Sequence, residues 1–159
     1  MLRRLVDVAI LLACGGGLLA AELSLPARVP LRDQATLPLT LRGAEQNLTA
    51  LQCDLQFDGG VLDVSAAPGP ASSAAGKSVV VRSLGTGRLR LIVAGMNRTA
   101  IRDGAVVVVT VRARAAGTNR AEFAVRILNA AGASADGNLL RMETRAGSVT
   151  TGADEKELR

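Results

Sequence analysis

The chain has 159 residues, a length that fits one domain built around a single hydrophobic core. It contains no His, Trp or Tyr, and its two aromatic residues are Phe57 and Phe123. The net charge of +5 comes from 19 basic and 14 acidic residues. The basic residues are spread along the chain without aromatic residues on which bases could stack, so the composition argues against nucleic acid as a partner and predicts an Arg-rich surface in water.

The first 21 residues have the pattern of an export signal. Met1–Arg4 is basic, Leu5–Leu19 is mostly apolar, and small residues precede Glu22. The apolar run is too short and interrupted to span a bilayer, so we expect a secreted or extracytoplasmic protein without a transmembrane helix in the mature chain. In an alternative interpretation, Leu11–Cys14 is a lipobox, Cys14 carries a lipid, and the protein is anchored to the cell envelope.

These assignments divide the chain into a signal segment, 1–21, a folded domain, 22–151, and a charged tail, 152–159. If Cys14 is removed or lipidated, Cys53 has no partner for an internal disulfide. Cys53 belongs to the apolar phase of its strand, and no His or Lys lies near it in the sequence. We therefore expect a small buried side chain rather than a reactive thiol.

Short β-strands are predicted along the whole domain. The clearest pattern is in Leu51–Val64, where Leu51, Cys53 and Leu55 alternate with polar residues before the pair Gly59–Gly60 permits a turn. About nine strands are expected among the segments 23–26, 36–42, 48–58, 61–66, 78–82, 88–94, 106–111, 122–127, 139–144 and 147–151. This succession without crossover helices predicts an all-β antiparallel sandwich or barrel.

Several segments have individual features. Leu23–Pro26 is predicted to be a short edge strand, and Pro38 argues for an edge position of the next strand. Val106–Val111 is nearly all β-branched, which is typical of a central strand. Pro68–Lys77 is predicted to be a loop without a core-forming residue and the most mobile connection.

Catalysis is disfavoured because the chain has no His and no close pair of carboxylates outside turns and the tail. It also lacks a motif for a serine nucleophile, a phosphate loop or a zinc site. We therefore expect a protein that is not an enzyme and needs no cofactor. Asp58, Asp63 and Asp103 lie near turns and are candidate calcium ligands, although turn hydrogen bonds explain them better.

Four stretches resemble cohesin domains in sequence and order. They are ATLPLTLRG at 35–43, LQCDLQFDGGVLDV at 51–64, IRDGAVVVVTVRARA at 101–115 and DGNLLRMETRAGSVTT at 136–151. The resemblance implies a nine-stranded antiparallel jelly-roll β-sandwich, related in fold to carbohydrate-binding modules. It also implies a non-catalytic function, since cohesins bind dockerin-bearing proteins through one face of a sheet.

By position, that face includes the strand at 48–58. The resemblance implies that Gln52, Asp54 and Gln56 point outward and that Arg88 and Arg90 project from a strand of the same face. Such side chains could form hydrogen bonds to a partner helix. The resulting prediction is an exported module that binds a dockerin-type protein, in an extracellular polysaccharide-degrading assembly.

Two alternatives stay open. A carbohydrate-binding module of the same fold would bind a soluble glycan or polysaccharide, but both Phe residues are in apolar phases, so no row of aromatic side chains is expected for stacking on sugars. A structural or adhesion domain of the cell envelope is the other alternative. Gln52 stands where dockerin-binding cohesins often have an acidic residue, and the Tyr residues usual around that surface are missing.

Overall fold

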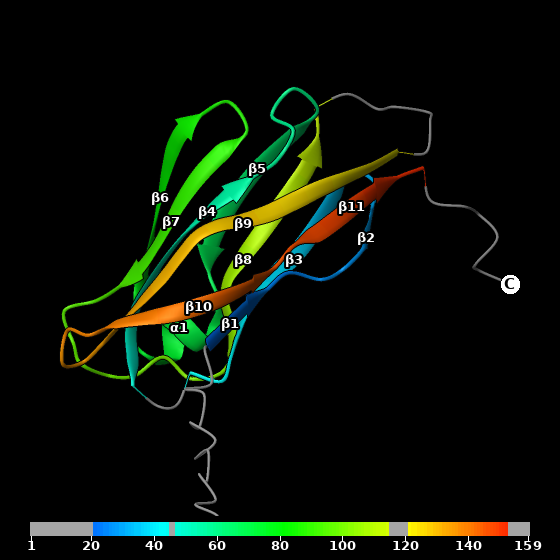
Figure 1. Ribbon diagram of the computed structural model, residues 1–159. Helices are drawn as coiled ribbons and strands as arrows, with labels where there is room; N and C mark the ends of the chain where they lie inside the picture. The colour runs from blue at the N-terminus through cyan, green and yellow to red at the C-terminus, as the bar shows by residue number, and fades with distance from the viewer. Residues whose placement is uncertain (1–20, 45–46, 115–120, 153–159) are drawn as a thin grey trace, which may run out of the picture.

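The computed structural model describes residues 21–44, 47–114 and 121–152, which form a β-sandwich with one short helix (Figure 1). The strands are β1 (Ala21–Ser24), β2 (Val29–Leu31), β3 (Gln34–Arg42), β4 (Leu48–Gln56), β5 (Leu62–Pro68), β6 (Ser78–Gly85), β7 (Arg88–Ala94), β8 (Gly104–Ala113), β9 (Ala121–Ser134), β10 (Leu139–Arg145) and β11 (Gly147–Thr151). Helix α1 is Pro70–Ala74. The sandwich predicted from sequence is confirmed, although the described residues form eleven strands rather than nine and two of the strand pairings are parallel. Strand β2 was not indicated by the sequence pattern.

The strands form two layers whose directions cross at an angle in Figure 1. One layer has the order β5-β8-β3-β1, and the other has the order β10-β9-β4-β7-β6. Neighbours within each layer are antiparallel, whereas β1 pairs in parallel with β10 and so connects the two layers. Strand β11 continues the second layer by pairing with β9, and it pairs in parallel with β2.

The core lies between the two layers and consists mainly of Leu and Val side chains. Strand β4 contributes Leu51, Cys53 and Leu55, which are at most 2% exposed. The facing layer contributes the alternate residues of β3 and β8, among them Leu37 and Val109, both without solvent exposure. The predicted phase of β4 is therefore confirmed, and the β-branched strand β8 is central, between β5 and β3.

Two predictions about edge strands are wrong. Strand β1 lies between β3 and β10, and β3 lies between β8 and β1. The ladder of β1 with β3 joins Glu22–Ser24 to Thr40–Arg42 and stops before Pro38. A proline, which lacks a donor, is tolerated there because the neighbouring strand has already ended.

The segment 68–77 is not the unanchored loop predicted from its composition. It contains helix α1, and it is attached to β8 by hydrogen bonds from the Gly69 N–H and the Ser72 hydroxyl to the carbonyl of Val106. Lys77 is 5% exposed, and its Nζ donates to both the carbonyl and the Oδ1 of Asn97 at 2.8 Å. Backbone and polar groups thus anchor a segment that has no large apolar side chains.

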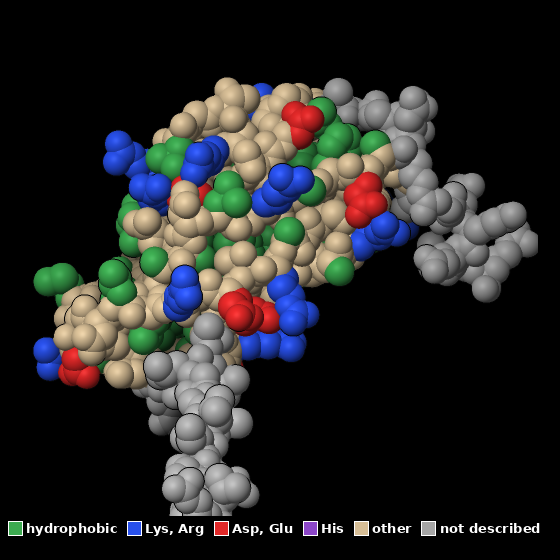
Figure 2. Space-filling view, viewed as in Figure 1, with side chains coloured by type: hydrophobic (Ala, Val, Ile, Leu, Met, Phe, Trp, Pro, Cys, Tyr) green, Lys and Arg blue, Asp and Glu red, His purple; other side chains and the backbone are tan. Residues whose placement is uncertain are grey.

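Basic side chains are numerous on the surface, as the composition predicts. Figure 2 shows them spread over the visible face, with several gathered where β6 and β7 lie. Within the described parts of the chain, no helix is long and apolar enough to cross a membrane. The predicted signal segment up to residue 20, the lipobox with Cys14 and the tail from residue 153 lie outside the described residues.

Candidate functional site

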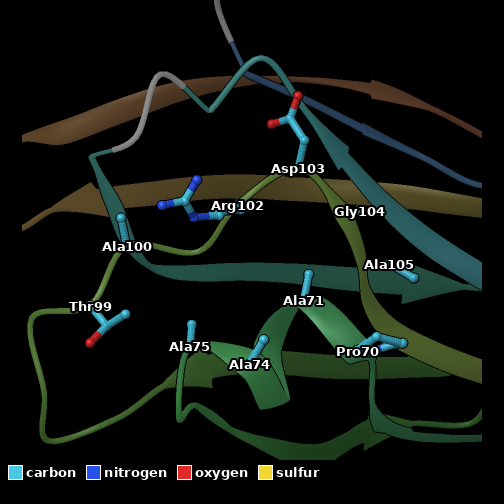
Figure 3. A pocket seen from close by; sticks show the side chains of 10 residues that line it. All are labelled: Pro70, Ala71, Ala74, Ala75, Thr99, Ala100, Arg102, Asp103, Gly104 and Ala105. Carbon is cyan, nitrogen blue, oxygen red and sulfur yellow. The ribbon is translucent and has the colours of Figure 1, made fainter.

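Among the hollows on the described part of the surface, two of several hundred Å³ were candidates, and neither has the chemistry of an active site. The first, of about 360 Å³, lies between α1 and residues 99–105 and is lined largely by Ala side chains (Figure 3). The second, of about 440 Å³, lies near the β6–β7 turn and includes Phe57, Leu89 and Arg114. Each hollow has a single carboxylate in its lining, Asp103 or Asp63, and neither carboxylate is hydrogen-bonded to a hydroxyl group of the same lining.

The aspartates considered as calcium ligands have other contacts. Asp103 accepts hydrogen bonds from the N–H groups of Gly43 and Ala44, at 2.9 and 3.1 Å. Asp58 accepts from the Gly60 N–H at 3.0 Å, which closes the turn after β4. Asp63 forms an ion pair with Arg114, in which Oδ1 of Asp63 lies 3.6 Å from Nη2 of Arg114. Across the described ranges, no three acidic or Cys side chains group as metal ligands would.

The candidate binding residues come together on the outer side of the second layer. Strand β4 lies between β7 and β9, and its register with β7 places Asp54 opposite Arg90 and Gln56 opposite Arg88. Gln52 lies opposite Ile92 in the same register. All five candidates therefore share one face, which we call the outer face of β9, β4, β7 and β6.

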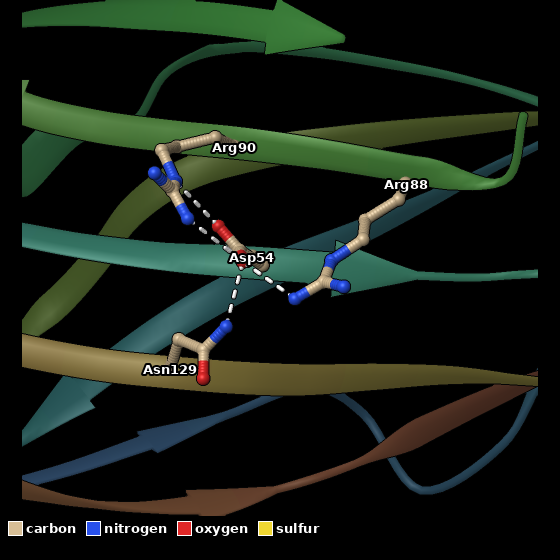
Figure 4. A network of polar contacts seen from close by, with 4 residues as sticks. All are labelled: Asp54, Arg88, Arg90 and Asn129. Carbon is tan, nitrogen blue, oxygen red and sulfur yellow. Dashed lines mark hydrogen bonds and ion pairs between the residues drawn. The ribbon is translucent and has the colours of Figure 1, made fainter. Parts of the chain in front are cut away.

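Asp54 is the centre of a polar network on this face (Figure 4). Its Oδ1 accepts from Arg90 Nε at 2.7 Å, and its Oδ2 accepts from Arg90 Nη2 at 3.1 Å and Arg88 Nη2 at 3.0 Å. The fourth donor is Asn129 Nδ2, at 2.8 Å from Oδ2. One of the four hydrogen bonds is to Oδ1 and three are to Oδ2, and these donors surround the carboxylate so that a partner cannot reach it.

The side chain of Asp54 is 0% exposed, whereas those of Arg88 and Arg90 are 39% and 33% exposed. Asp54 is thus covered by its own hydrogen-bond donors on an otherwise open face. The hydrogen bond from Arg90 is the main cause that holds the pKa of Asp54 well below its usual range, and the same bond raises the pKa of Arg90. The outward phase of Asp54 is as predicted, but its carboxylate is not available for direct contact.

Asn129 is a member of the network that the sequence analysis missed. It lies in β9 with a φ of 51°, a left-handed conformation that Asn tolerates better than most residues. The register places Leu128 opposite Asp54 and Ala131 opposite Gln52, so β9 has one residue more than β4 in this interval. This β-bulge directs the Asn129 amide to Asp54. The only signal in the sequence is a single Asn within an otherwise apolar run.

The outer face of the opposite layer has a different chemistry. Thr36 pairs with Thr110, which in turn pairs with Ser65, so hydroxyl groups occupy its middle. Pro38 and Val108 form the next pair along the ladder. Charged residues such as Arg42, Asp63 and Arg112 lie further along this face, but among the described residues none of its carboxylates is buried in a network like that around Asp54.

The sequence model of the cohesin domain matches residues 32–151. The chain belongs to the cohesin domain family. Cohesin domains are non-catalytic interaction modules, so this chain is a protein–protein interaction module and not an enzyme. The resemblance inferred from the four sequence stretches is confirmed by this match.

Solved cohesin structures have the same fold. A non-cellulosomal cohesin from Archaeoglobus fulgidus has a TM-score of 0.70 and 16% identity, with 87% of this chain and 94% of that chain covered. The sixth cohesin of scaffoldin B from Acetivibrio cellulolyticus, solved with a Cel5 dockerin, has a TM-score of 0.71 and 13% identity, with 82% and 97% covered. At these identities the likeness shows the fold alone. No curated protein sequence matches the chain.

Proposed function

We propose that this cohesin domain binds a dockerin-type protein module through the outer face of β9, β4, β7 and β6. The observation that carries the proposal is the buried Asp54 network, which holds two Arg side chains in fixed positions on an exposed sheet face. Cohesins of the same fold from Acetivibrio cellulolyticus and Clostridium thermocellum were solved in complex with dockerins.

The network suits binding better than it suits folding. A buried charge is costly to remove from water, and an apolar pair at the same position often stabilises a protein as well or better. Arg side chains that are already held by Asp54 lose less conformational entropy when a partner binds. Arg is also enriched in the centres of protein interfaces. The arrangement of Asp54, Arg88 and Arg90 therefore supports a prepared docking surface.

The dimensions of the face fit helices. Neighbouring strands lie about 4.8 Å apart, so four strands present a surface roughly 19 Å wide. An α-helix with its side chains is about 10 Å in diameter, so one or two helices can lie on this surface. Both aromatic residues, Phe57 and Phe123, pack partly buried against the core. The described residues thus offer no exposed aromatic row on which sugar rings could stack.

A displayed library of dockerin modules, probed with the folded chain, tests this function. We expect some dockerins to bind, and we expect Gln52→Trp, in the middle of the face, to abolish their binding by steric block. Thr36→Trp on the opposite layer is the matched control and should bind as the wild type does. Failure of every dockerin to bind, or equal binding by the Gln52→Trp variant, would contradict the proposal. Binding to a polysaccharide panel alone would favour the carbohydrate-binding alternative.

We further propose that the domain, 22–151, acts outside the cytoplasm after export directed by residues 1–21. Cleavage before Glu22 would keep the three β1 pairs with β3 that begin at Glu22. Lipidation of Cys14 would instead keep residues 15–20 between the lipid-bearing residue and β1. Mass spectrometry of the mature protein should find Glu22 as the first residue, whereas an acylated Cys14 would establish the anchored alternative. A polysaccharide-degrading assembly is one setting for the module, and the fold also occurs in a non-cellulosomal cohesin.

A further inference from the structure

The outer face of β9, β4, β7 and β6 is divided into a basic half and an apolar half. In the basic half, Arg82 pairs with Arg90 across β6 and β7, and Gln56 lies between Arg88 and Arg126. Two residues further along the strands, the next row is Val80, Ile92, Gln52 and Ala131. The division follows the strand register and therefore runs across four strands.

The basic half has a clear excess of positive charge. Its four Arg residues and the single carboxylate of Asp54 give a net charge of +3, from 4 minus 1. Arg82 and Arg126 make no hydrogen bond or ion pair with any residue that the structure describes. An anionic partner group would therefore find these two guanidinium groups without a competing contact.

The side chains of the basic half offer a partner almost only hydrogen-bond donors, the N–H groups of the guanidinium groups. Each guanidinium has five N–H donors, of which Arg88 uses one and Arg90 uses two for Asp54. The Nε of Arg88 is buried without a partner. Because the side chains of Arg88 and Arg90 are 39% and 33% exposed, N–H groups that Asp54 does not engage remain for a partner. Asp54 is covered by its own donors and cannot accept from a partner. The complementary group must bring acceptors, and carboxylates fit the guanidinium fork best.

The apolar half requires a different complement. Val80 is 56% exposed, and its neighbour Ile92 in β7 is half-buried. Ala131 is also half-buried and lies beyond Gln52, in β9. Leu139, opposite Ala133 at the end of this half, is 85% exposed. Exposed apolar side chains that adjoin a charged region are typical of an interface. A partner that covers both halves needs apolar side chains next to its acidic ones.

We propose that the partner segment is an amphipathic helix that places carboxylates on the basic half and apolar side chains on Val80 and Ile92. This inference rests on the proposed function and specifies the chemistry of the partner. The rows of Ile92 and Arg88 are four residues apart, or about 13 Å along a strand. A helix rises about 1.5 Å per residue and returns to the same face after seven or eight residues, which span about 11–12 Å. The apolar and acidic residues should therefore be about seven or eight positions apart.

A displayed library of helical peptides with randomised surface positions tests this inference with the full chain as bait. We expect the selected peptides to carry Asp or Glu seven or eight positions from Leu, Ile or Val. Their affinity should fall about tenfold for Arg82→Glu combined with Arg126→Glu, and it should weaken with rising salt. Neither residue forms a hydrogen bond or ion pair with the Asp54 network, so the double variant should fold, as circular dichroism would verify. Arg42→Glu on the opposite layer is the matched control and should bind normally.

The outcomes separate this inference from the proposed function. Suppose that the selected peptides are neutral or basic and that Gln52→Trp abolishes their binding. This result would overturn the inference of an acidic partner but would still support the proposed binding face. Acidic peptides whose affinity is unchanged by the double Arg variant would also overturn it. If Gln52→Trp does not affect peptide binding, the peptides bind elsewhere on the protein. This result would overturn the proposal that the outer face of β9, β4, β7 and β6 is the binding surface. A library without binders would count against an amphipathic helix as the partner.

Discussion

Arg90 holds Asp54 across β7 and β4 with two hydrogen bonds, from Nε to Oδ1 at 2.7 Å and from Nη2 to Oδ2 at 3.1 Å. This fork fixes both side chains, because a planar guanidinium matches the two oxygens of a carboxylate. Arg88 and Asn129 complete the network from either side. The pair therefore links the stability of the second layer to the shape of its outer face.

Replacing Asp54 by Asn should destabilise the domain by about 1–3 kcal/mol, because three charge-assisted hydrogen bonds from Arg residues are weakened or lost. Urea denaturation of the purified chain measures this change. Asp63→Asn is the control: the Asp63 side chain is 71% exposed and its ion pair with Arg114 is long, so this variant should unfold like the wild type. Equal effects of the two substitutions would contradict a special contribution of Asp54.

Stability should also depend on pH through Asp54. Because the pKa of Asp54 is lowered in the folded state, its contribution is complete above the unfolded value of about 4 and is lost as the pH falls below it. Urea denaturation at a series of pH values should show that the free energy of unfolding falls less at acidic pH for Asp54→Asn than for the wild type. Parallel curves for the two proteins would refute the lowered pKa.

Leu55→Asp should abolish cooperative folding. Leu55 has no solvent exposure and no cation beside it in the core, so an ionised Asp there has no compensation. The neighbouring residue provides a matched control, since Gln56 is exposed and Gln56→Asp lies beside Arg88 and Arg126. Thermal unfolding followed by circular dichroism distinguishes the two, and a soluble Leu55→Asp variant that melts cooperatively would disprove the register of β4.

The two glycines after β4 should differ in their tolerance of alanine. A Cβ at Gly59 would clash with the backbone nitrogen of Gly87, whereas the nearest atom at Gly60 is Asp58 Oδ1 at 3.3 Å. Gly59→Ala should therefore cost about 1–3 kcal/mol by separating this turn from the β6–β7 turn, and Gly60→Ala should cost clearly less. Paired urea denaturation curves measure the difference, and equal stabilities would contradict the close approach.

Cys53 should be unreactive in the folded protein. Burial, together with the adjacent charge of Asp54, raises the pKa of its thiol to about 12, so almost no thiolate is present near neutral pH. In a Cys14→Ser variant, iodoacetamide at pH 8 should modify Cys53 only after denaturation, as mass spectrometry would show. Rapid alkylation under native conditions would contradict the burial of this side chain.

Strand phases were predictable because side chains alternate with a period of two along a strand. Leu51, Cys53 and Leu55 are buried as this period indicates, and the Gly pair after β4 does mark a turn. The anchoring of the segment 68–77 was not predictable, because it depends on the carbonyl of Val106, over thirty residues further along the chain. Composition describes side chains and contains no information about such distant backbone partners.

The local sequence alone determined that Gln52, Asp54 and Gln56 share the outward phase of one strand, because this follows from the pleat of the backbone. Only the tertiary structure decided what surrounds them. The strand order places β7 and β9 on either side of β4, and the bulge in β9 directs Asn129 to Asp54. These placements depend on pairing between segments 34 to 75 residues apart, which no local pattern specifies. Because of these placements, Asp54 is a buried carboxylate that positions Arg88 and Arg90, and not only a polar residue of an alternating strand.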